Sequence, residues 1–310
     1  MSKLSFQSLI SIDQLSNGDI KLIFKKAAEM QAGYRSRKIN QRFKGKILTA
    51  LFYEPSSRTF ASFISAAQRL GCGVIPMHGM DFSSVAKGET FEDTIKTFSL
   101  LSDILIIRHP DNFSAEQAAT ISNVPVINAG DGVGEHPTQA LLDAFTISRH
   151  FKNLKKIKVG MVGDLKNGRT VHSLSLLLLK MGVKKYTWIS PKALKMPKNI
   201  NEIVLKTGTD VSETENLAEN VAKLDVLYMT RVQKERFGSE AQYQKYKGRY
   251  IINEDIMKKA KKEMILMHPL PRIDEIVPAV DKDMRSLYFR EQIPNGLFVR
   301  MALLELMLAK

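Results

Sequence analysis

Residues 52–63, Phe-Tyr-Glu-Pro-Ser-Ser-Arg-Thr-Phe-Ala-Ser-Phe, join a predicted strand to a predicted helix. The apolar run just before them, residues 47–52, is typical of a buried strand, and apolar residues at helical spacing follow from Phe60. The turn between them, Ser56–Thr59, holds three hydroxyls and one guanidinium. Because the N–H groups at a helix start attract anions, this turn can surround a phosphate with donors. The alternative is that a serine of the turn only caps the helix.

Apolar runs alternate with helical patterns along the rest of the chain. This alternation predicts an α/β fold, with parallel sheets wound with helices. Predicted helices between the strands include residues 89–101, 137–151 and 170–181. The predicted strands cover residues 46–52, 73–76, 104–108, 124–128, 158–162, 186–189, 226–229 and 264–268.

Two domains are expected, because 310 residues exceed what one compact core usually takes. A fresh set of strands begins after the basic segment 152–156, so the predicted boundary lies near residue 150. The predicted domains are residues 1–150 and 151–293, each a doubly wound parallel sheet. Residues 294–310 predict a final amphipathic helix, because apolar side chains recur there at helical spacing.

The composition is that of an ordinary globular protein, with 44% apolar and 25% charged residues. No run of 18 apolar residues occurs and the N-terminus lacks a signal-peptide pattern, so we expect no membrane span. The single cysteine, Cys72, excludes an internal disulfide and fits a reducing, cytoplasmic compartment. The six histidines show no metal-like spacing, which predicts no metal and no cofactor.

The net charge is +14, and a basic balance can indicate a nucleic-acid partner. Here the lysines are scattered in short groups without interleaved aromatic residues, and no nucleic-acid-binding motif is visible. We therefore expect no nucleic-acid partner. The charge is interpreted as a lysine-rich surface, which can also attract anionic substrates.

Two later segments extend the chemistry of the Ser56–Thr59 turn. Residues 135–143 read Glu-His-Pro-Thr-Gln-Ala-Leu-Leu-Asp, and residues 268–276 read His-Pro-Leu-Pro-Arg-Ile-Asp-Glu-Ile. In order and spacing, the three segments resemble the catalytic chains of the aspartate carbamoyltransferase (aspartate transcarbamoylase) family. The resemblance runs from about residue 45 to the C-terminus and also includes residues 108–110, 128–132, 162–173 and 228–236.

The resemblance implies transfer of the carbamoyl group from carbamoyl phosphate to the amine of L-aspartate, an early step of pyrimidine synthesis. Both substrates are anions, and the reaction depends on donors aimed at a developing oxyanion. Ligands of open α/β sheets bind at the carboxyl ends of strands. Since the matched motifs follow strands of both halves, we expect a site between the two domains. In this family the final helix crosses back onto the first domain.

The resemblance assigns carbamoyl phosphate mostly to residues of the first half. Position 57 is serine where the family usually has threonine, a change that keeps the hydroxyl. Taken alone, Arg108 would be a surface arginine and His136 a turn residue. The implied carbamoyl-phosphate ligands are Ser56, Ser57, Arg58, Thr59, Arg108, His136, Gln139, Pro269 and Leu270. The residues implied to act in catalysis are Arg58, Thr59, Lys87, Arg108 and His136.

The implied aspartate ligands are Lys87, Arg169, Arg231 and Gln233. Arg231 can alternatively pair with Glu235, four residues further on. Residues 83–89 resemble a family loop that enters the site of the neighbouring subunit with a lysine and a serine. Some members have two adjacent lysines there, whereas position 86 of this chain is alanine. Lys87 takes the lysine role, and the serine is Ser83 or Ser84. A homotrimer with shared sites is therefore implied, and a separate regulatory chain remains an open partner.

Two other functions stay open. An ornithine carbamoyltransferase would share the phosphate half, but it typically has a cysteine where this chain has Pro269. Its substrate is also cationic, whereas Arg231 and Arg272 provide positive charge that suits a dicarboxylate. A non-catalytic protein of the same fold is the third hypothesis, although every matched position keeps a side chain able to act.

Overall fold

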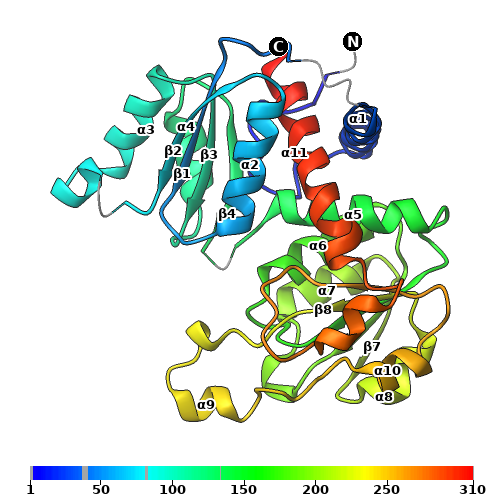
Figure 1. The fold of residues 1–310 in the computed structure, drawn as a ribbon. Helices are drawn as coiled ribbons and strands as arrows, with labels where there is room; N and C mark the ends of the chain where they lie inside the picture. The colour runs from blue at the N-terminus through cyan, green and yellow to red at the C-terminus, as the bar shows by residue number, and fades with distance from the viewer. Residues whose placement is uncertain (1–2, 37–40, 81–82, 133, 310) are drawn as a thin grey trace. The chain divides into compact units, whose positions relative to one another are not determined.

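The protein, described by a computed structural model, divides into two units (Figure 1). The described residues are 3–36, 41–80, 83–132 and 134–309. Unit 1 comprises Met1–Leu142 with Asn295–Lys310, and unit 2 comprises Asp143–Pro294. Each unit contains one wholly parallel sheet, so the predicted fold class, two doubly wound α/β units, is confirmed.

The sheet of unit 1 has the strand order β2-β1-β3-β4. Its strands are β1 (Ile47–Phe52), β2 (Gly73–His78), β3 (Ile104–His109) and β4 (Val126–Asp131). All but the first residue of β1 are buried, as expected for a parallel strand covered on both faces. Leu9 pairs with the outer side of β4, donating its N–H to the Val126 carbonyl over 2.8 Å, which covers that edge of the sheet.

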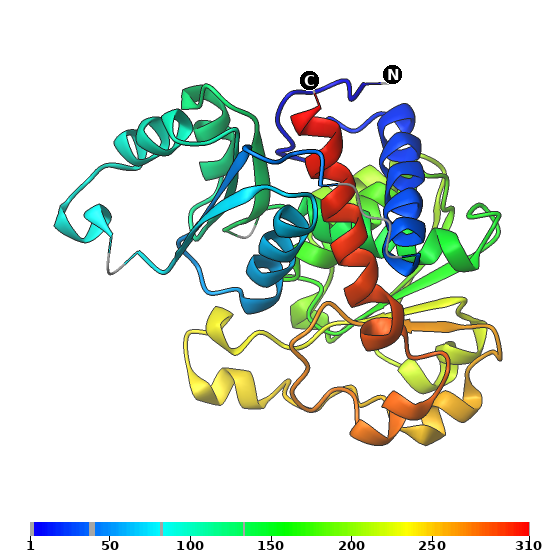
Figure 2. The same cartoon turned by 45° about the horizontal axis from the view of Figure 1, so that its top comes forward.

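Helices cover both faces of this sheet (Figures 1 and 2). Helix α2 (Ser57–Arg69) packs against β1 and β2, whereas α3 (Phe91–Leu100) and α4 (Ser114–Ile121) pack against β3 and β4 on the other face. Helix α1 (Asn17–Arg35) was not predicted, although a capping box between Ser16 and Asp19 marks its start.

The C-terminal helix α11 (Ile293–Leu308) lies beside α1 and α2, with residues from 295 onward in unit 1. The predicted amphipathic character is wrong, because Asn295, Arg300 and Glu305 are buried together with the apolar side chains. Arg300 Nη1 donates to the Ser62 hydroxyl of α2 over 3.0 Å, and Lys26 of α1 lies 3.4 Å from Glu305. Partners on the neighbouring helices therefore replace solvent for these polar groups. Residue 310, the last of the predicted helix, lies outside the described residues.

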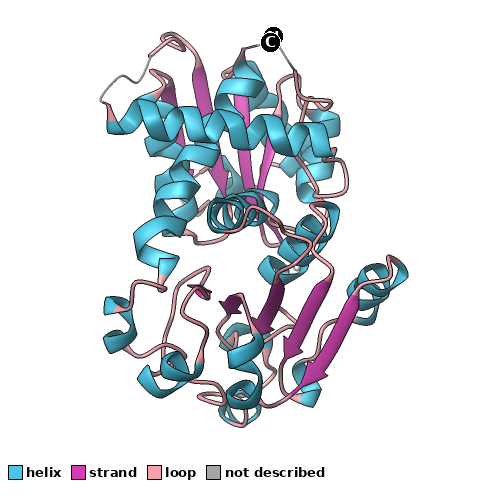
Figure 3. Cartoon of the chain, turned by 90° about the vertical axis from the view of Figure 1, so that its right-hand side faces the viewer, coloured by secondary structure: helices cyan, strands magenta, loops and turns pink. Residues whose placement is uncertain are grey.

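The sheet of unit 2 has the order β7-β6-β5-β8-β9. Figure 3 draws the strands of both sheets in magenta. The prediction missed β7, an edge strand whose polar side chains are partly or fully exposed. The strands are β5 (Lys158–Val162), β6 (Lys185–Ile189), β7 (Asp210–Thr214), β8 (Val226–Met229) and β9 (Ile265–Met267). The helices are α5 (Pro137–His150), which begins in unit 1, α6 (Arg169–Lys180), α7 (Lys198–Lys206), α8 (Leu217–Asn220), α9 (Glu240–Gln244) and α10 (Glu254–Lys259).

Candidate active site

In each sheet the strand order reverses at one point. Residues predicted to bind the substrates lie at or just after the ends of the strands beside that point. In unit 1 the chain passes from β1 outward to β2 and then from β3 outward to β4, so the reversal lies between β1 and β3. In unit 2 it lies between β5 and β8. Open α/β sheets bind ligands at the carboxyl ends of the strands at such points. The Ser56–Thr59 turn and Arg108 lie at the reversal point of unit 1, and Arg169 and Arg231 lie at the reversal point of unit 2.

The Ser56–Thr59 turn forms the start of α2. Ser56 precedes the first helical residue, yet its side chain makes no capping hydrogen bond, and the first turn contains no acidic residue. The capping alternative therefore does not describe Ser56. Arg58 is exposed and Thr59 is buried. The positive end of the helix dipole at this turn favours an anion.

Arg108 lies beside this turn, at the end of β3. Its backbone is opposite Phe52, and its carbonyl accepts the Tyr53 N–H over 2.9 Å. Its Nη2 atom is 2.8 Å from Glu54 Oε2, and Nη1 donates to the Ala129 carbonyl over 3.3 Å. Only 11% of the Arg108 side chain is exposed, so the Glu54 carboxylate holds the guanidinium in place. Sequence analysis missed Glu54, although an acidic residue two positions before the Ser56–Thr59 turn was a visible signal.

His136 and Gln139 come from the loop after β4 and the first turn of α5. His136 is 4% exposed, and its carbonyl accepts the Gln139 N–H over 3.0 Å. The His136 ring Nδ1 lies 3.5 Å from the Thr138 hydroxyl. The buried Asp131 carboxylate, which accepts the Glu135 N–H over 3.1 Å, fixes the loop. Because β4 neighbours β3, His136 follows the strand adjacent to that of the Arg108 guanidinium.

Lys87 lies on a short 3₁₀ turn, η1 (Ser84–Lys87), and its side chain is exposed. The two candidate serines differ in their contacts. The Ser83 hydroxyl accepts the Val85 N–H over 3.2 Å and donates to the Met80 carbonyl over 2.8 Å, whereas Ser84 is exposed. The structure therefore places the lysine on the surface of unit 1.

The loops after β5 and β8 meet within unit 2. Gly163 has a φ of 114°, and a Cβ atom there would lie 2.1 Å from the Thr230 carbonyl oxygen, so the close approach requires glycine. Gln233 Nε2 donates over 3.0 Å to the carbonyl of Asn167, two residues before Arg169. The structure thus brings together the segments that carry Arg169 and Gln233.

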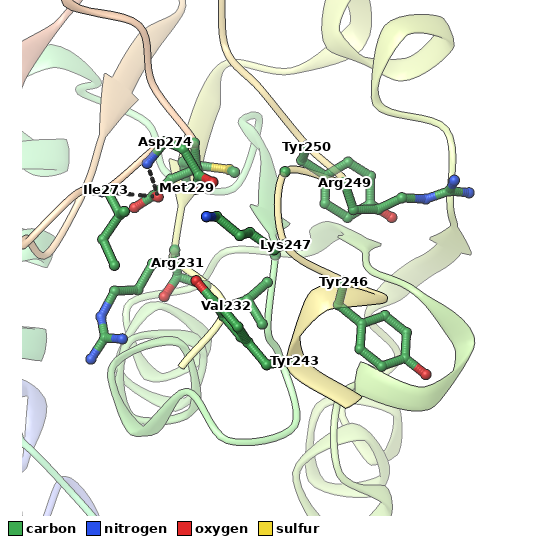
Figure 4. A pocket seen from close by; sticks show the side chains of 14 residues that line it. Met229, Arg231, Val232, Tyr243, Tyr246, Lys247, Arg249, Tyr250, Ile273 and Asp274 are labelled. Atoms are coloured by element: carbon green, nitrogen blue, oxygen red, sulfur yellow. Dashed lines mark hydrogen bonds between the residues drawn. The ribbon is translucent and has the colours of Figure 1, made fainter. Parts of the chain in front are cut away.

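Arg231 forms the pair with Glu235 that was the alternative to substrate binding. Its Nη1 donates to Glu235 Oε2 over 3.0 Å and its Nη2 donates to Oε1. Burial alone would raise the pKa of the Glu235 carboxyl, but its bonds to Arg231 lower that pKa below its ordinary value. In Figure 4 the guanidinium points away from Lys247, which reaches into a pocket also lined by Tyr243 and Asp274. A substrate carboxylate must therefore compete with Glu235 for Arg231.

Buried His268 fixes the segment after β9. Its Nδ1 accepts the Leu270 N–H over 2.8 Å, so Nε2 carries the proton and donates to Glu275 Oε1 over 2.8 Å. The other oxygen of Glu275 accepts the N–H groups of the two preceding residues, each over 3.1 Å. Burial raises the pKa of Glu275, but the His268 pair and the N–H donors together lower it. These contacts set the backbone course at Pro269 and Leu270.

Arg272 is already paired within unit 2. Its Nη1 and Nη2 donate to Asp281, the latter over 2.6 Å, and Nη1 also lies 3.1 Å from the Tyr288 hydroxyl. Because Asp281 balances the charge of Arg272, this arginine does not support the expectation of a dicarboxylate substrate.

In the described part of the chain, no group of three or more His, Cys, Asp or Glu side chains is placed to hold a metal ion. Burial raises the pKa of the Cys72 thiol to about 11, so the thiol stays protonated near neutral pH. None of the described helices is long and apolar enough to cross a membrane.

Two family models match nearly the whole chain. Residues 7–149 match the carbamoyl-phosphate-binding domain of the aspartate/ornithine carbamoyltransferases, and residues 155–307 match their aspartate/ornithine-binding domain. The chain is 47% identical over 302 residues to the aspartate carbamoyltransferase catalytic subunit of Thermococcus gammatolerans, covering 97% of both. It is 46% identical to the chloroplastic aspartate carbamoyltransferase 1 of Pisum sativum, covering 99% of this chain and 80% of the relative.

Solved structures agree with these matches. Aspartate transcarbamoylase from Trypanosoma cruzi, in complex with carbamoyl phosphate and aspartate, superposes with a TM-score of 0.91 at 42% identity, covering 97% and 96% of the two chains. The same protein in complex with N-(phosphonacetyl)-L-aspartic acid gives 0.90 at 42% identity, covering 97% and 95%. The chain therefore belongs to the aspartate/ornithine carbamoyltransferase family. These relatives are aspartate carbamoyltransferases, which confirms the resemblance drawn from the motifs.

Proposed function

We propose that the chain transfers the carbamoyl group of carbamoyl phosphate to the amine of L-aspartate, giving N-carbamoyl-L-aspartate and phosphate. The supporting observation is that cationic side chains flank the reversal point of both sheets, while both substrates are anions. Residues 1–150 with 294–310 bind carbamoyl phosphate, and residues 151–293 bind aspartate. The product enters pyrimidine synthesis.

The phosphate is held by the Ser56–Thr59 turn, where hydroxyls, the Arg58 guanidinium and the helix start supply donors. Arg108 and His136 donate to the carbonyl oxygen. The amine attacks the carbonyl carbon, the C–N bond forms, and negative charge develops on that oxygen. The bond to phosphate then breaks, and the proton that the amine loses passes to the departing phosphate. Placed donors of this kind typically contribute about 3–4 kcal/mol each to the transition state.

The remaining groups orient the two substrates. Gln139 binds the carbamoyl amide, and the Pro269 and Leu270 carbonyls accept from that amide and from the attacking amine. The aspartate carboxylates bind Arg169, Arg231, Gln233 and Lys87. Holding both reactants in attacking geometry lowers the entropic part of the barrier. N-(phosphonacetyl)-L-aspartic acid joins a phosphonate to an aspartate, so it is a proposed ligand of this chain too.

The assembly is proposed to be a homotrimer in which Lys87 and either Ser83 or Ser84 complete the site of the neighbouring subunit. The exposure of Lys87 supports this proposal. Leu100 and Leu101 are 77% and 56% exposed at the end of α3, as is typical of side chains in a protein interface. A regulatory chain is the candidate additional partner, since relatives such as the Thermococcus proteins are named catalytic subunits.

A cytoplasmic location is proposed because the lone, buried Cys72 fits a reducing compartment. The relatives from Pisum sativum are named chloroplastic.

The activity is tested by incubating the purified chain with carbamoyl phosphate and either L-aspartate or L-ornithine. We expect carbamoyl-aspartate and no appreciable carbamoyl-ornithine. The guanidinium groups of Arg169 and Arg231 suit a dicarboxylate, and they repel the cationic side chain of ornithine. Each product is measured chromatographically. Preferential carbamoylation of ornithine would overturn the aspartate assignment and favour the alternative branch of the family.

A further inference from the structure

Unit 2 contains a continuous chain of buried polar groups, the Asp143 network, formed by Asp143, Thr170, Tyr228, His268, Glu275 and Gln292. Except for Thr170, none of these residues is more than 4% exposed. Buried polar groups that satisfy one another hold their segments in a single arrangement. The network is therefore a candidate for fixing the geometry of unit 2.

Asp143 is the centre of the network. The Tyr228 hydroxyl donates to its Oδ2 over 2.7 Å, and Gln292 Nε2 donates to its Oδ1 over 2.6 Å. Thr170 also hydrogen-bonds the Tyr228 hydroxyl. Burial and the negative charge of Asp143 raise the pKa of Tyr228, so the phenol remains a donor. Both oxygens of the carboxylate thus have buried partners.

Gln292 carries the network onward to the segment after β9. Its Oε1 accepts the His268 N–H over 3.0 Å. The His268 ring then joins the Leu270 N–H to Glu275, as described above. The position of the Asp143 carboxylate is in this way tied to the backbone of residues 268–270.

Three residues of the Asp143 network are close in the sequence to residues proposed to bind the substrates. Thr170 follows Arg169 directly, Tyr228 lies on β8 three residues before Arg231, and His268 precedes Pro269. The segments that carry the aspartate ligands and the Pro269–Leu270 carbonyls are therefore joined through buried hydrogen bonds rather than through solvent. A reacting group held by such supports keeps its place to within a fraction of an ångström.

We infer that Asp143 and Tyr228 are positioning residues, which align the arginines and carbonyls of unit 2 for attack by the aspartate amine. The inference rests on the roles proposed above for Arg169, Arg231, Pro269 and Leu270. It adds two buried residues that touch neither substrate and act through those groups.

The test compares Tyr228→Phe with Tyr186→Phe. Both tyrosines are fully buried on strands of the same sheet, and Tyr186 donates only to the Ser175 carbonyl, over 3.1 Å. Tyr186→Phe loses this one hydrogen bond, whereas Tyr228→Phe loses the bonds of its hydroxyl to Asp143 and Thr170. We expect Tyr228→Phe to lower kcat/KM for aspartate about tenfold to a hundredfold, as small misplacements of reacting groups do. Tyr186→Phe should keep kcat and KM for aspartate within twofold.

Asp143 gives a graded version of the same test. Asp143→Asn keeps an acceptor oxygen and should retain more activity than Asp143→Ala, with folding of each variant checked by thermal melting. Equal kinetics for the two tyrosine variants, or a Tyr228→Phe enzyme with unchanged KM and kcat for aspartate, would overturn the inference. Arg169→Ala distinguishes a failure of the proposed substrate-binding residues from a failure of the Asp143 network. If Arg169→Ala and Tyr228→Phe both leave aspartate kinetics unchanged, the proposed substrate-binding roles are wrong. If Arg169→Ala impairs aspartate kinetics and Tyr228→Phe does not, only the positioning role of the Asp143 network is wrong.

Discussion

Replacing Arg58 by alanine is expected to lower kcat/KM for carbamoyl phosphate by about 10- to 150-fold while the fold stays intact. The side chain is exposed at the start of α2, so its removal creates no cavity. A hydrogen bond to a charged group contributes about 1.5–3 kcal/mol, which corresponds to that range of rates. The loss should appear in steady-state kinetics with varied carbamoyl phosphate.

Arg69 supplies the matched control for this experiment, because it lies at the other end of the same helix and stacks over the Tyr34 ring. Arg69→Ala should keep kcat/KM within twofold and melt at a temperature similar to that of Arg58→Ala. An Arg58→Ala enzyme with undiminished kcat/KM would remove Arg58 from the site.

A second large effect is expected when two inactive variants are mixed. Arg58→Ala and Lys87→Ala are each expected to retain at most about a tenth of native activity. Chains dissociated in mild denaturant and reassembled at equal amounts should recover about a quarter of native activity. In a closed trimer with shared sites, a random pair of neighbours then supplies both intact groups about one time in four. Activity is measured after exchange has been verified by mass spectrometry of the intact trimers.

The control mixes Arg58→Ala with the double variant Arg58→Ala/Lys87→Ala. No neighbour in that mixture supplies an intact Arg58, so activity should not return. Exchanged trimers of the first mixture that remain as inactive as their parents would show that Lys87 does not act across a subunit boundary.

The fold was predictable where burial leaves a signal in the sequence. Strands β1, β5 and β8 are apolar runs because both faces of a parallel sheet are covered, and their bounds differ little from those predicted. Strand β7 reads Asp-Val-Ser-Glu-Thr, and at the edge of the sheet it needs no apolar run. In α11, a hydrogen bond and an ion pair to the neighbouring helices allow polar residues inside, so apolar periodicity predicted the wrong face pattern.

The parts of the candidate site that lie within local sequence motifs were predictable. The Ser56–Thr59 turn, Arg169 and Arg231 follow strands of a sheet as expected, and Arg108 lies at the end of β3. Partners that arise only in three dimensions were not predictable. Asp143 meets Tyr228 and Gln292 across 85 and 149 residues of sequence, and no spacing rule links positions so far apart.

The proposal that unit 1 binds carbamoyl phosphate and unit 2 binds aspartate is tested most directly by the binding of N-(phosphonacetyl)-L-aspartic acid. Kd is measured by titration calorimetry for the native chain, Arg58→Ala, Arg169→Ala and the control Arg69→Ala, with carbamoyl phosphate as a second ligand. We expect Arg58→Ala to weaken both ligands at least tenfold, because each carries the phosphate-like group. Arg169→Ala should weaken the aspartate-containing ligand alone, and Arg69→Ala neither. If Arg169→Ala binds N-(phosphonacetyl)-L-aspartic acid as tightly as the native chain, or Arg58→Ala leaves both Kd values unchanged, the account is contradicted.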